Sequence, residues 1–331
     1  MGRGLILASI GWFVVLAWSP GAGPPVPPST PAVWMGPPSY DNGKCFRALF
    51  ERPDEWRQTR GVVDVLLYAD HHLRRQFTDA ELRAWFALLR QWRLPLALEV
   101  GAIKPWGPTA EATFRAQRAH WDAFRRLGAD IHAVVLDEPL LCSRTVLKKT
   151  DEYAVEQTAE FVALVRRHYP GVRIGDIEPY PSIPLNDHRW WVDTLQRRLA
   201  DRGVRGLDFY RLDVNWAEFV VFARGSWPEV RQVERHCRSR KLPFGLIYWA
   251  SDYPALTQRR LADDATWYVS LQRQGYDYAM VDGHPDHYVL QSWLPAPSRC
   301  TPETDPSTFT RSVLDFTRRF VKPTQAAREK R

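Results

Sequence analysis

Two adjacent carboxylic acids end an apolar run in the segment IHAVVLDEPLL, residues 131–141. Asp137 and Glu138 follow the run directly, and Pro139 comes next. A carboxylic acid that is partly buried beside a second negative charge keeps its proton near neutral pH, which is what a general acid requires. Such a pair can protonate a leaving oxygen and assist the attacking group, as in the hydrolysis of a glycosidic bond. These two residues are therefore the first candidates for chemistry.

Further acids and aromatic residues lie at the ends of other apolar runs. We expect Glu138 to be catalytic, with Glu178 or Asp252 as the second carboxylate. Flat aromatic faces stack on sugar rings, and nearby polar groups fix the orientation of a ligand. The candidate substrate-binding residues, each in or just past such a run, are Glu99, Asp137, Asp176, Tyr180, Tyr210, Asp213, Tyr248, Trp249, Asp282, His284 and Trp293.

Eight short apolar runs alternate with amphipathic helical patterns, and these elements must position the candidate residues. The runs predicted to be strands are 32–36, 62–70, 94–101, 131–138, 172–180, 206–214, 243–251 and 276–283. The predicted helices include 78–92, where Thr78 and Glu81 match a capping box, and 254–274. Continuous apolar strands in strict alternation with helices indicate an α/β fold, a single (β/α)8 TIM barrel over residues 32–322. A doubly wound open sheet is the alternative, but the chain has no GxGxxG turn.

In such barrels the active site lies at the C-terminal ends of the strands, so these acids would form a ring there. Alternation along a strand puts Asp176 and Glu178 on one side. Two other functions use the same residue types. A metal-dependent hydrolase or isomerase would use His71, His284 and Asp282 with one or two Glu residues, although the HxH and HExxH spacings are absent. A non-catalytic carbohydrate-binding barrel would lack the second carboxylate.

The sequence LDEP at the end of the fourth predicted strand resembles the Asn-Glu-Pro element of the large clan of retaining glycoside hydrolases with a (β/α)8 fold. The resemblance implies that Glu138 is the general acid/base and Asp137 a sugar-binding neighbour. The clan's nucleophile is a Glu at the end of the seventh strand, where this chain has IYWASDY with Asp252 and no Glu. We therefore expect a carbohydrate substrate, no cofactor and no bound metal, with the second carboxylate open between Glu178 and Asp252.

The two ends of the chain have compositions unlike the rest. Arg3 and the apolar stretch LILASIGWFVVLAW predict a signal peptide or an uncleaved N-terminal anchor over residues 1–23. The stretch is shorter than the ~20 residues that span a bilayer, so no stable membrane span is expected after signal removal. Residues 24–31 read as a proline-rich linker, and residues 323–331 as a basic tail. The protein is expected to be secreted or periplasmic, or anchored if the segment is retained.

Charge and cysteine content limit the partners further. The net charge of +7 is spread as single and paired arginines along helical segments, which is typical of a solvated helical surface rather than a nucleic-acid site. Export permits disulfides, and the four cysteines match no zinc-binding spacing. If the barrel closes, Cys45 and Cys300 follow neighbouring strands, so they are the candidate disulfide.

Overall fold

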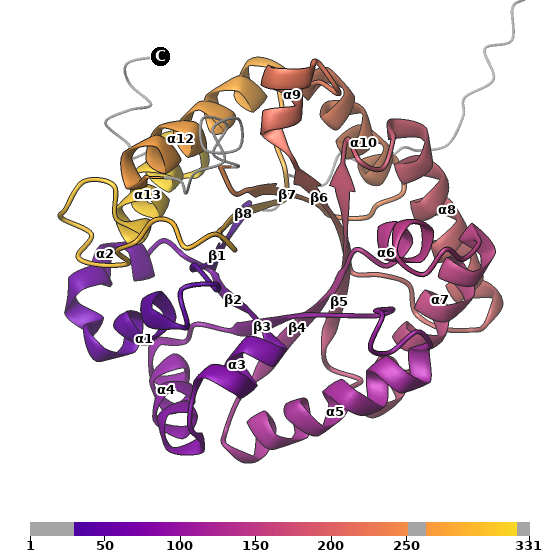
Figure 1. Ribbon diagram of the computed structural model, residues 1–331, viewed down its shortest axis with the longest axis horizontal. Coiled ribbons are helices and arrows are strands. Elements are labelled where there is room, and N and C mark those ends of the chain that lie inside the picture. Colours follow the sequence, from indigo (N-terminus) through magenta and orange to yellow (C-terminus); the bar gives the residue numbers. More distant parts are fainter. Residues whose placement is uncertain (1–29, 251–262, 323–331) are drawn as a thin grey trace, which may run out of the picture.

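Eight parallel strands close into a barrel in the order of the sequence, with β8 paired to β1 (Figure 1). The computed structural model describes residues 30–250 and 263–322. The strands are β1 (Ala32–Gly36), β2 (Val65–Ala69), β3 (Leu96–Val100), β4 (Ile131–Asp137), β5 (Arg173–Tyr180), β6 (Phe209–Val214), β7 (Phe244–Tyr248) and β8 (His287–Gln291). The predicted (β/α)8 TIM barrel is therefore confirmed.

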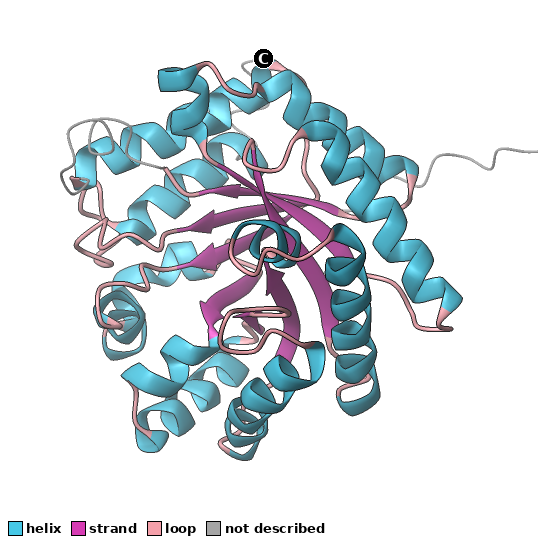
Figure 2. Cartoon of the chain, turned by 45° about the vertical axis from the view of Figure 1, so that its right-hand side comes forward, coloured by secondary structure: helices cyan, strands magenta, loops and turns pink. Residues whose placement is uncertain are grey.

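Helices surround the strands on the outside of the barrel (Figure 2). They are α1 (Lys44–Glu51), η1 (Pro53–Trp56), α2 (Arg57–Arg60), α3 (Asp70–Gln76), α4 (Asp79–Trp92), α5 (Ala110–Arg126), α6 (Pro139–Thr145), α7 (Asp151–His168), α8 (Leu185–Asp201), α9 (Trp216–Phe222), α10 (Trp227–Ser239), α12 (Asp264–Met280), α13 (Phe309–Phe316) and the π-helical turn η2 (Thr317–Val321). The predicted capping box is present at α4, where Thr78 accepts from the Glu81 backbone N–H and Glu81 accepts from that of Thr78. No helix in the described residues is long and apolar enough to cross a bilayer.

Side chains of the strands alternate between the barrel interior and the helical layer. The interior cluster, which contains one set of alternating positions, is Trp34, Val65, Leu67, Ala97, Ala133, Val135, Ile177, Phe209, Ile247 and Val289. The intervening positions, such as Leu66, Leu98 and Leu246, pack with the helices in the larger outer core. Both faces of each strand are therefore buried, as in other parallel sheets covered by helices.

The eighth strand was predicted at the wrong place. Residues 276–283 were expected to form it, but α12 continues to Met280 and β8 begins at His287. The helix is fixed by its buried face, because Trp267, Leu271 and Tyr278 recur at helical spacing and each is at most 1% exposed. The other seven predicted strands overlap the observed ones. The start of the helix predicted over 254–274 lies outside the described residues.

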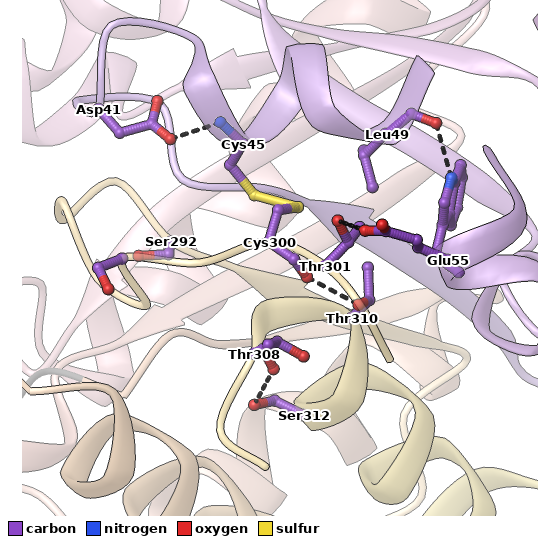
Figure 3. The surroundings of a disulfide bond; sticks show 12 residues. Asp41, Cys45, Leu49, Glu55, Ser292, Cys300, Thr301, Thr308, Thr310 and Ser312 are labelled. Atoms are coloured by element: carbon purple, nitrogen blue, oxygen red, sulfur yellow. Dashed lines mark hydrogen bonds between the residues drawn. A yellow bond between two sulfur atoms is a disulfide. The ribbon is translucent and has the colours of Figure 1, made fainter. Parts of the chain in front are cut away.

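A disulfide joins Cys45 to Cys300, with 4.8 Å between their Cα atoms (Figure 3). It connects α1, which follows β1, to the segment that follows β8, so the predicted pairing is confirmed. Nearby, the Thr310 hydroxyl donates to the Cys300 carbonyl, and the Thr301 hydroxyl donates to Glu55 (Figure 3). The predicted targeting segment 1–23, most of the linker 24–31 and the tail 323–331 lie outside the described residues.

Candidate active site

A cavity of about 230 Å³ opens at the C-terminal ends of the strands. Four of its lining residues are acidic, and the complete lining is Ser39, Tyr40, Ala69, His71, His72, Glu99, Asp137, Glu138, Ile177, Asp213, Ile247 and Trp293. We call this cavity the acid pocket. It gathers five of the residues that the sequence nominated for catalysis or substrate binding: Glu99, Asp137, Glu138, Asp213 and Trp293.

Strand alternation explains why three of these acids face inward. Glu99 and Asp137 follow the inward-facing Ala97 and Val135 by two positions, and Asp213 follows Arg211, which lies over Trp34 in the interior, by two positions. The carboxylate of Glu99 accepts a hydrogen bond of 2.7 Å from the Gln291 side chain of β8, which reaches across the barrel mouth. The last acidic side chains of three strands thus point into the same space.

Lys104 brings a positive charge to the same space from the loop after β3. Its Nζ lies 2.5 Å from Oδ2 of Asp137, and its side chain is only 19% exposed. Burial alone would lower the pKa of Lys104, but the adjacent Asp137 carboxylate raises it overall. Asp137 is therefore held in an ion pair, with one oxygen directed at the lysine.

Glu138 takes a backbone conformation that is rare for a non-glycine residue. Its φ is 51° and its ψ is 50°, in the left-handed region. Its N–H donates to the Ile177 carbonyl of β5, and Pro139 begins α6 directly after it. A left-handed conformation costs on the order of 1–3 kcal/mol, and such strain is concentrated at functional sites. This turn lets the residue after an inward-facing Asp137 also line the acid pocket.

Glu178 lies behind this turn and not in the acid pocket. It is fully buried, and it accepts hydrogen bonds from the backbone N–H groups of Leu140 and Leu141, at 2.5 and 3.1 Å. These are N-terminal N–H groups of α6, so Glu178 supplies the helix cap that Glu138 does not provide. The structure therefore places Glu178 as a support for the backbone of Glu138, away from the cavity where a second catalytic carboxylate was expected.

Four more predicted binding residues face the helical layer, because they share the outward positions of their strands. Asp176 accepts from the Trp191 indole N–H at 2.6 Å, and the Tyr180 hydroxyl donates to Glu229 of α10. The Tyr210 hydroxyl pairs with Nδ1 of His188 at 2.7 Å, and Tyr248 stacks on Tyr288. None of the four lines the acid pocket.

Asp282 and His284 lie at the opposite end of the barrel. They precede β8, and Asp282 is highly exposed and paired with Arg231 and His284. The misplaced eighth strand caused this prediction to fail, because residues expected after a strand come before one. The metal-ligand set of His71 with Asp282 and His284 is therefore not brought together, and the described residues contain no group of three or more His, Cys, Asp or Glu side chains arranged to hold a metal ion. Asp252 lies outside the described residues.

Two tryptophans form an aromatic pair beside the acids. Trp249 follows β7 and Trp293 follows β8, and their rings are stacked with 5.0 Å between centroids and an interplanar angle of 23°. The Trp249 side chain is also a neighbour of Asp213, whose pKa it lowers in opposition to burial. The site therefore combines an apolar wall with acidic side chains.

Burial and mutual repulsion raise the pKa of three of the acids. Burial, followed by the charge of Asp137, raises the pKa of both Glu138 and Glu99 to about 7. Burial, then the charges of Glu138, Glu99 and Asp137, raise the pKa of Asp213 well above its usual value. Near neutral pH the cluster therefore holds both protonated and ionised carboxyl groups, as acid and base catalysis requires.

Arg211 occupies the barrel interior beneath the acids. Its guanidinium lies 3.8 Å from the ring centroid of Trp34, and all three of its nitrogens lack hydrogen-bond partners among the described residues. Gly245 makes room for it, because a Cβ there would meet Cγ of Arg211 at 2.7 Å. Burial lowers the pKa of Arg211 well below its usual value, and the charge of Glu99 opposes this shift.

Sequence reasoning had not nominated several lining residues as substrate-binding groups. Ser39 and Tyr40 follow β1, where the sequence carries no acid to attract notice, and His72 follows β2. Lys104, which pairs with Asp137 without lining the cavity, lies in a loop after β3 and resembles any other surface lysine in the sequence. Their shared signal is position, since each follows a strand that ends at the mouth of the barrel.

Solved structures share this fold, although no family model and no curated protein matches the sequence. The Xyn10A xylanase of Cellvibrio japonicus, a thermostable mutant, has a TM-score of 0.52 and 10% identity over 79% of this chain and 86% of that chain. Xylanase 10C of the same organism, in complex with xylopentaose, has a TM-score of 0.51 and 12% identity over 90% and 68%. The xylanase XynB of Paenibacillus barcinonensis gives 0.51 and 12% over 85% and 88%.

The chain is thus a (β/α)8 TIM barrel whose structure is similar to those of xylanases. The resemblance to barrel glycoside hydrolases, first suggested by LDEP, is confirmed at the level of structure. At 10–12% identity the likeness concerns the fold alone, so the chemistry must be argued from the acid pocket.

Proposed function

We propose that the protein is a glycoside hydrolase that cleaves a glycosidic bond in an oligosaccharide or polysaccharide. The observation that carries the proposal is the placement of Glu138: strained backbone, half-buried side chain, and a cavity shared with three other acids. Its raised pKa keeps the proton that a general acid must donate to the glycosidic oxygen as the bond to the anomeric carbon breaks. Asp137, paired with Lys104, lies where it can bind a sugar hydroxyl.

Asp213 is the second carboxylate in this proposal. It lines the acid pocket from β6 beside Trp249, whereas Glu99 accepts a hydrogen bond from Gln291. After burial, the charge of Glu138 is the next contribution to the raised pKa of Asp213. Protonation of Glu138 removes this contribution, so the two carboxyl groups do not lose their protons independently.

The Trp249–Trp293 pair supports a carbohydrate as the ligand. Stacked indole rings present an apolar face to the CH groups of a pyranose, and Trp293 lines the same cavity as Glu138. Asp252, the alternative second carboxylate from the sequence, falls on residues that the structure does not describe.

The proposal is tested with Glu138→Gln, Asp213→Asn and, as a matched control, Asp282→Asn at the other end of the barrel. On natural glycosides found by a substrate screen, we expect both pocket variants to lose about 10²–10⁴-fold in kcat/KM and the control to retain activity. Aryl glycosides with good leaving groups need no proton, so they should restore activity to Glu138→Gln but not to Asp213→Asn. Near wild-type rates for Glu138→Gln on natural substrates would refute the acid role.

A non-catalytic carbohydrate-binding barrel is the second candidate, because β7 ends without a carboxylate among the described residues. In that case the wild-type protein would bind oligosaccharides and hydrolyse none of them.

The anomeric configuration of the first product, measured by NMR, distinguishes direct attack by Asp213 from activation of a water molecule by Asp213.

We also propose that the protein is exported. The apolar segment after Arg3 and the Cys45–Cys300 disulfide both support an oxidising compartment outside the cytoplasm. Recovery of all the protein from the cytosolic fraction, with both cysteines reduced, would overturn this.

A further inference from the structure

A second cavity, of about 380 Å³, adjoins the acid pocket. Its lining residues are Ser39, Tyr40, Asn42, His71, His72, Arg75 and Gln76, and we call it the basic groove. Ser39, Tyr40, His71 and His72 line both cavities, so a ligand in the acid pocket extends directly into the groove. No lining residue of the groove is acidic, whereas four are acidic in the acid pocket.

Arg75 supplies a positive charge to this groove from α3. It is exposed and makes no hydrogen bond or ion pair within the described part of the chain. Its neighbour Arg74 differs, because its guanidinium is 2.6 Å from Oδ1 of Asp79. Of these two adjacent arginines on α3, the one facing the groove is therefore left without a counter-ion.

His72 adds an oriented hydrogen-bond donor. The Gln76 side-chain amide donates to Nδ1 of His72 at 2.7 Å and to the Ser39 carbonyl at 3.0 Å, while its oxygen accepts from Tyr68. These bonds fix the amide orientation, so Nδ1 of His72 is an acceptor and Nε2 carries the proton. Burial, followed by the charge of His71, lowers the pKa of His72 to about 4, so the ring is neutral near pH 7 and still donates through Nε2.

We propose that the basic groove binds an anionic group carried by the sugar chain, a uronic acid carboxylate or a sulfate ester, next to the bond positioned in the acid pocket. This assignment rests on the proposed function and names its substrate class. Arg75 provides the charge, and His72 and Asn42 provide neutral donors. The four acids of the acid pocket repel an anionic sugar there, so the two cavities together favour a chain with its charge at one defined position. The net charge of +7 favours the approach of such a polymer.

The test compares ligands matched except for charge. Calorimetry with Glu138→Gln would measure binding of xylo-oligosaccharides whose glucuronic acid side group is intact or reduced to glucose, and of carrageenan oligosaccharides that are sulfated or desulfated. We expect one anionic member to bind at least about tenfold more tightly than its neutral partner, a difference that shrinks as salt is raised. Which pair shows the difference identifies the carboxylate or the sulfate.

The variants in the same background are Arg75→Gln and, as the matched control on the same helix, Arg74→Gln. Arg75→Gln should abolish the preference for the anionic ligand while leaving the binding of neutral ligand and the thermal midpoint unchanged, and Arg74→Gln should keep the preference. Equal binding of neutral and anionic ligands, or a preference that survives Arg75→Gln, overturns the inference. Anionic binding that depends on Arg75 without hydrolysis by the wild type would instead refute the hydrolase proposal alone.

Discussion

Asp137 and Glu138 are neighbours in the chain, yet their carboxyl groups meet different surroundings. Asp137 lies against Lys104, whereas Glu138 turns through a left-handed backbone into a space where burial and the charge of Asp137 raise its pKa to about 7. One residue thus provides an ion pair and the other a proton. This division of roles between adjacent acids depends on a single backbone conformation.

Asp137→Asn tests that division through the pH dependence of the reaction. The charge of Asp137 raises the pKa of Glu138, and Lys104, freed from its partner, would lower it further, so both effects act in one direction. The protonated form of Glu138 is the active one, so the alkaline limb of the kcat/KM profile should move to lower pH in the variant. An alkaline limb that stays in place, or moves to higher pH, would show that Glu138 is not the acid. Asp282→Asn is the control and should leave the limb unchanged.

The sequence pattern predicted the acids of β3, β4 and β6 correctly, but it also nominated a larger number of residues that face the helices. Glu99, Asp137 and Asp213 share the acid pocket, while Asp176, Tyr180, Tyr210 and Tyr248 do not line it. Alternation along a strand predicts which side chains lie on the same side of the strand, but it does not predict which side faces the barrel interior. In a buried parallel strand both faces are apolar, so hydrophobicity cannot decide between them.

At the scale of elements, the end of β4 and the start of α6 form one unit with β5. Glu178 of β5 caps α6 through the N–H groups of Leu140 and Leu141, and the Ile177 carbonyl accepts from Glu138. The strained residue is therefore held by a neighbouring strand rather than by its own helix. In the proposed reaction, Glu178 would act only through the position of Glu138.

Glu178→Ala measures this positioning. Removing the acceptor should cost about 1–3 kcal/mol of unfolding free energy, because the buried N–H groups of Leu140 and Leu141 lose their partner. We expect kcat to fall at least about tenfold with little change in KM, and Glu178→Gln, which keeps an acceptor oxygen, to recover most of it. Asp208→Ala is the control, because Asp208 accepts from the Ile174 N–H at the other end of β5. It should lower stability and leave kcat unchanged; equal losses of kcat in both variants would refute positioning.

The failure at the eighth strand has a physical cause at the same scale. The segment 276–283 contains two tyrosines and a valine, which favour strands, but it is the end of α12. Tyr278 and Leu271 bury one helical face, and this tertiary packing overrides local preference. The true strand, His287–Gln291, is short, begins with histidine and ends with glutamine, so its apolar pattern is weak.

At the scale of the whole molecule, closure of the barrel brings together residues distant in the sequence. The Cys45–Cys300 disulfide spans 255 residues and ties the first βα unit to the segment after β8. Glu303 strengthens this closure, because its carboxylate accepts from the N–H groups of Gln58 and Thr59 in α2. The same closure places Gln291 of β8 against Glu99 of β3. Strict alternation of strands and helices predicted this closure, and the cysteine pairing followed from it.

The buried acids should make the fold less stable as pH rises from about 6.5 to 8. Burial raises the pKa of Glu99 and Glu138 to about 7 and that of Asp176 to about 8, whereas these groups are already ionised in the unfolded chain. In this window the folded state therefore binds more protons than the unfolded state, so the free energy of unfolding falls as pH rises. The full loss from each acid is about 1.4 kcal/mol for every unit by which its folded pKa exceeds its unfolded pKa. The buried histidines oppose this trend only at the lower end of the window. Burial lowers the pKa of His72 to about 4 and of His188 to about 3, while an unfolded histidine is about half protonated at pH 6.5 and progressively less so above it.

Asp176→Asn isolates one contribution to this pH dependence. The asparagine keeps an oxygen for the Trp191 indole N–H but has no proton to lose, and it removes a charge that raises the pKa of Glu178. The free energy of unfolding, measured by urea titration across the same window, should fall less steeply in the variant than in the wild type, and the variant should be the more stable protein at pH 8. Asp151→Asn is the control, because its hydrogen bond from Arg144 lowers the pKa of Asp151 and that carboxyl stays ionised throughout. If the free energy of unfolding of the wild type is constant or rises with pH, the acids in and around the acid pocket have ordinary pKa values. The proposed division of these acids into a proton donor and a proton acceptor would then have no basis.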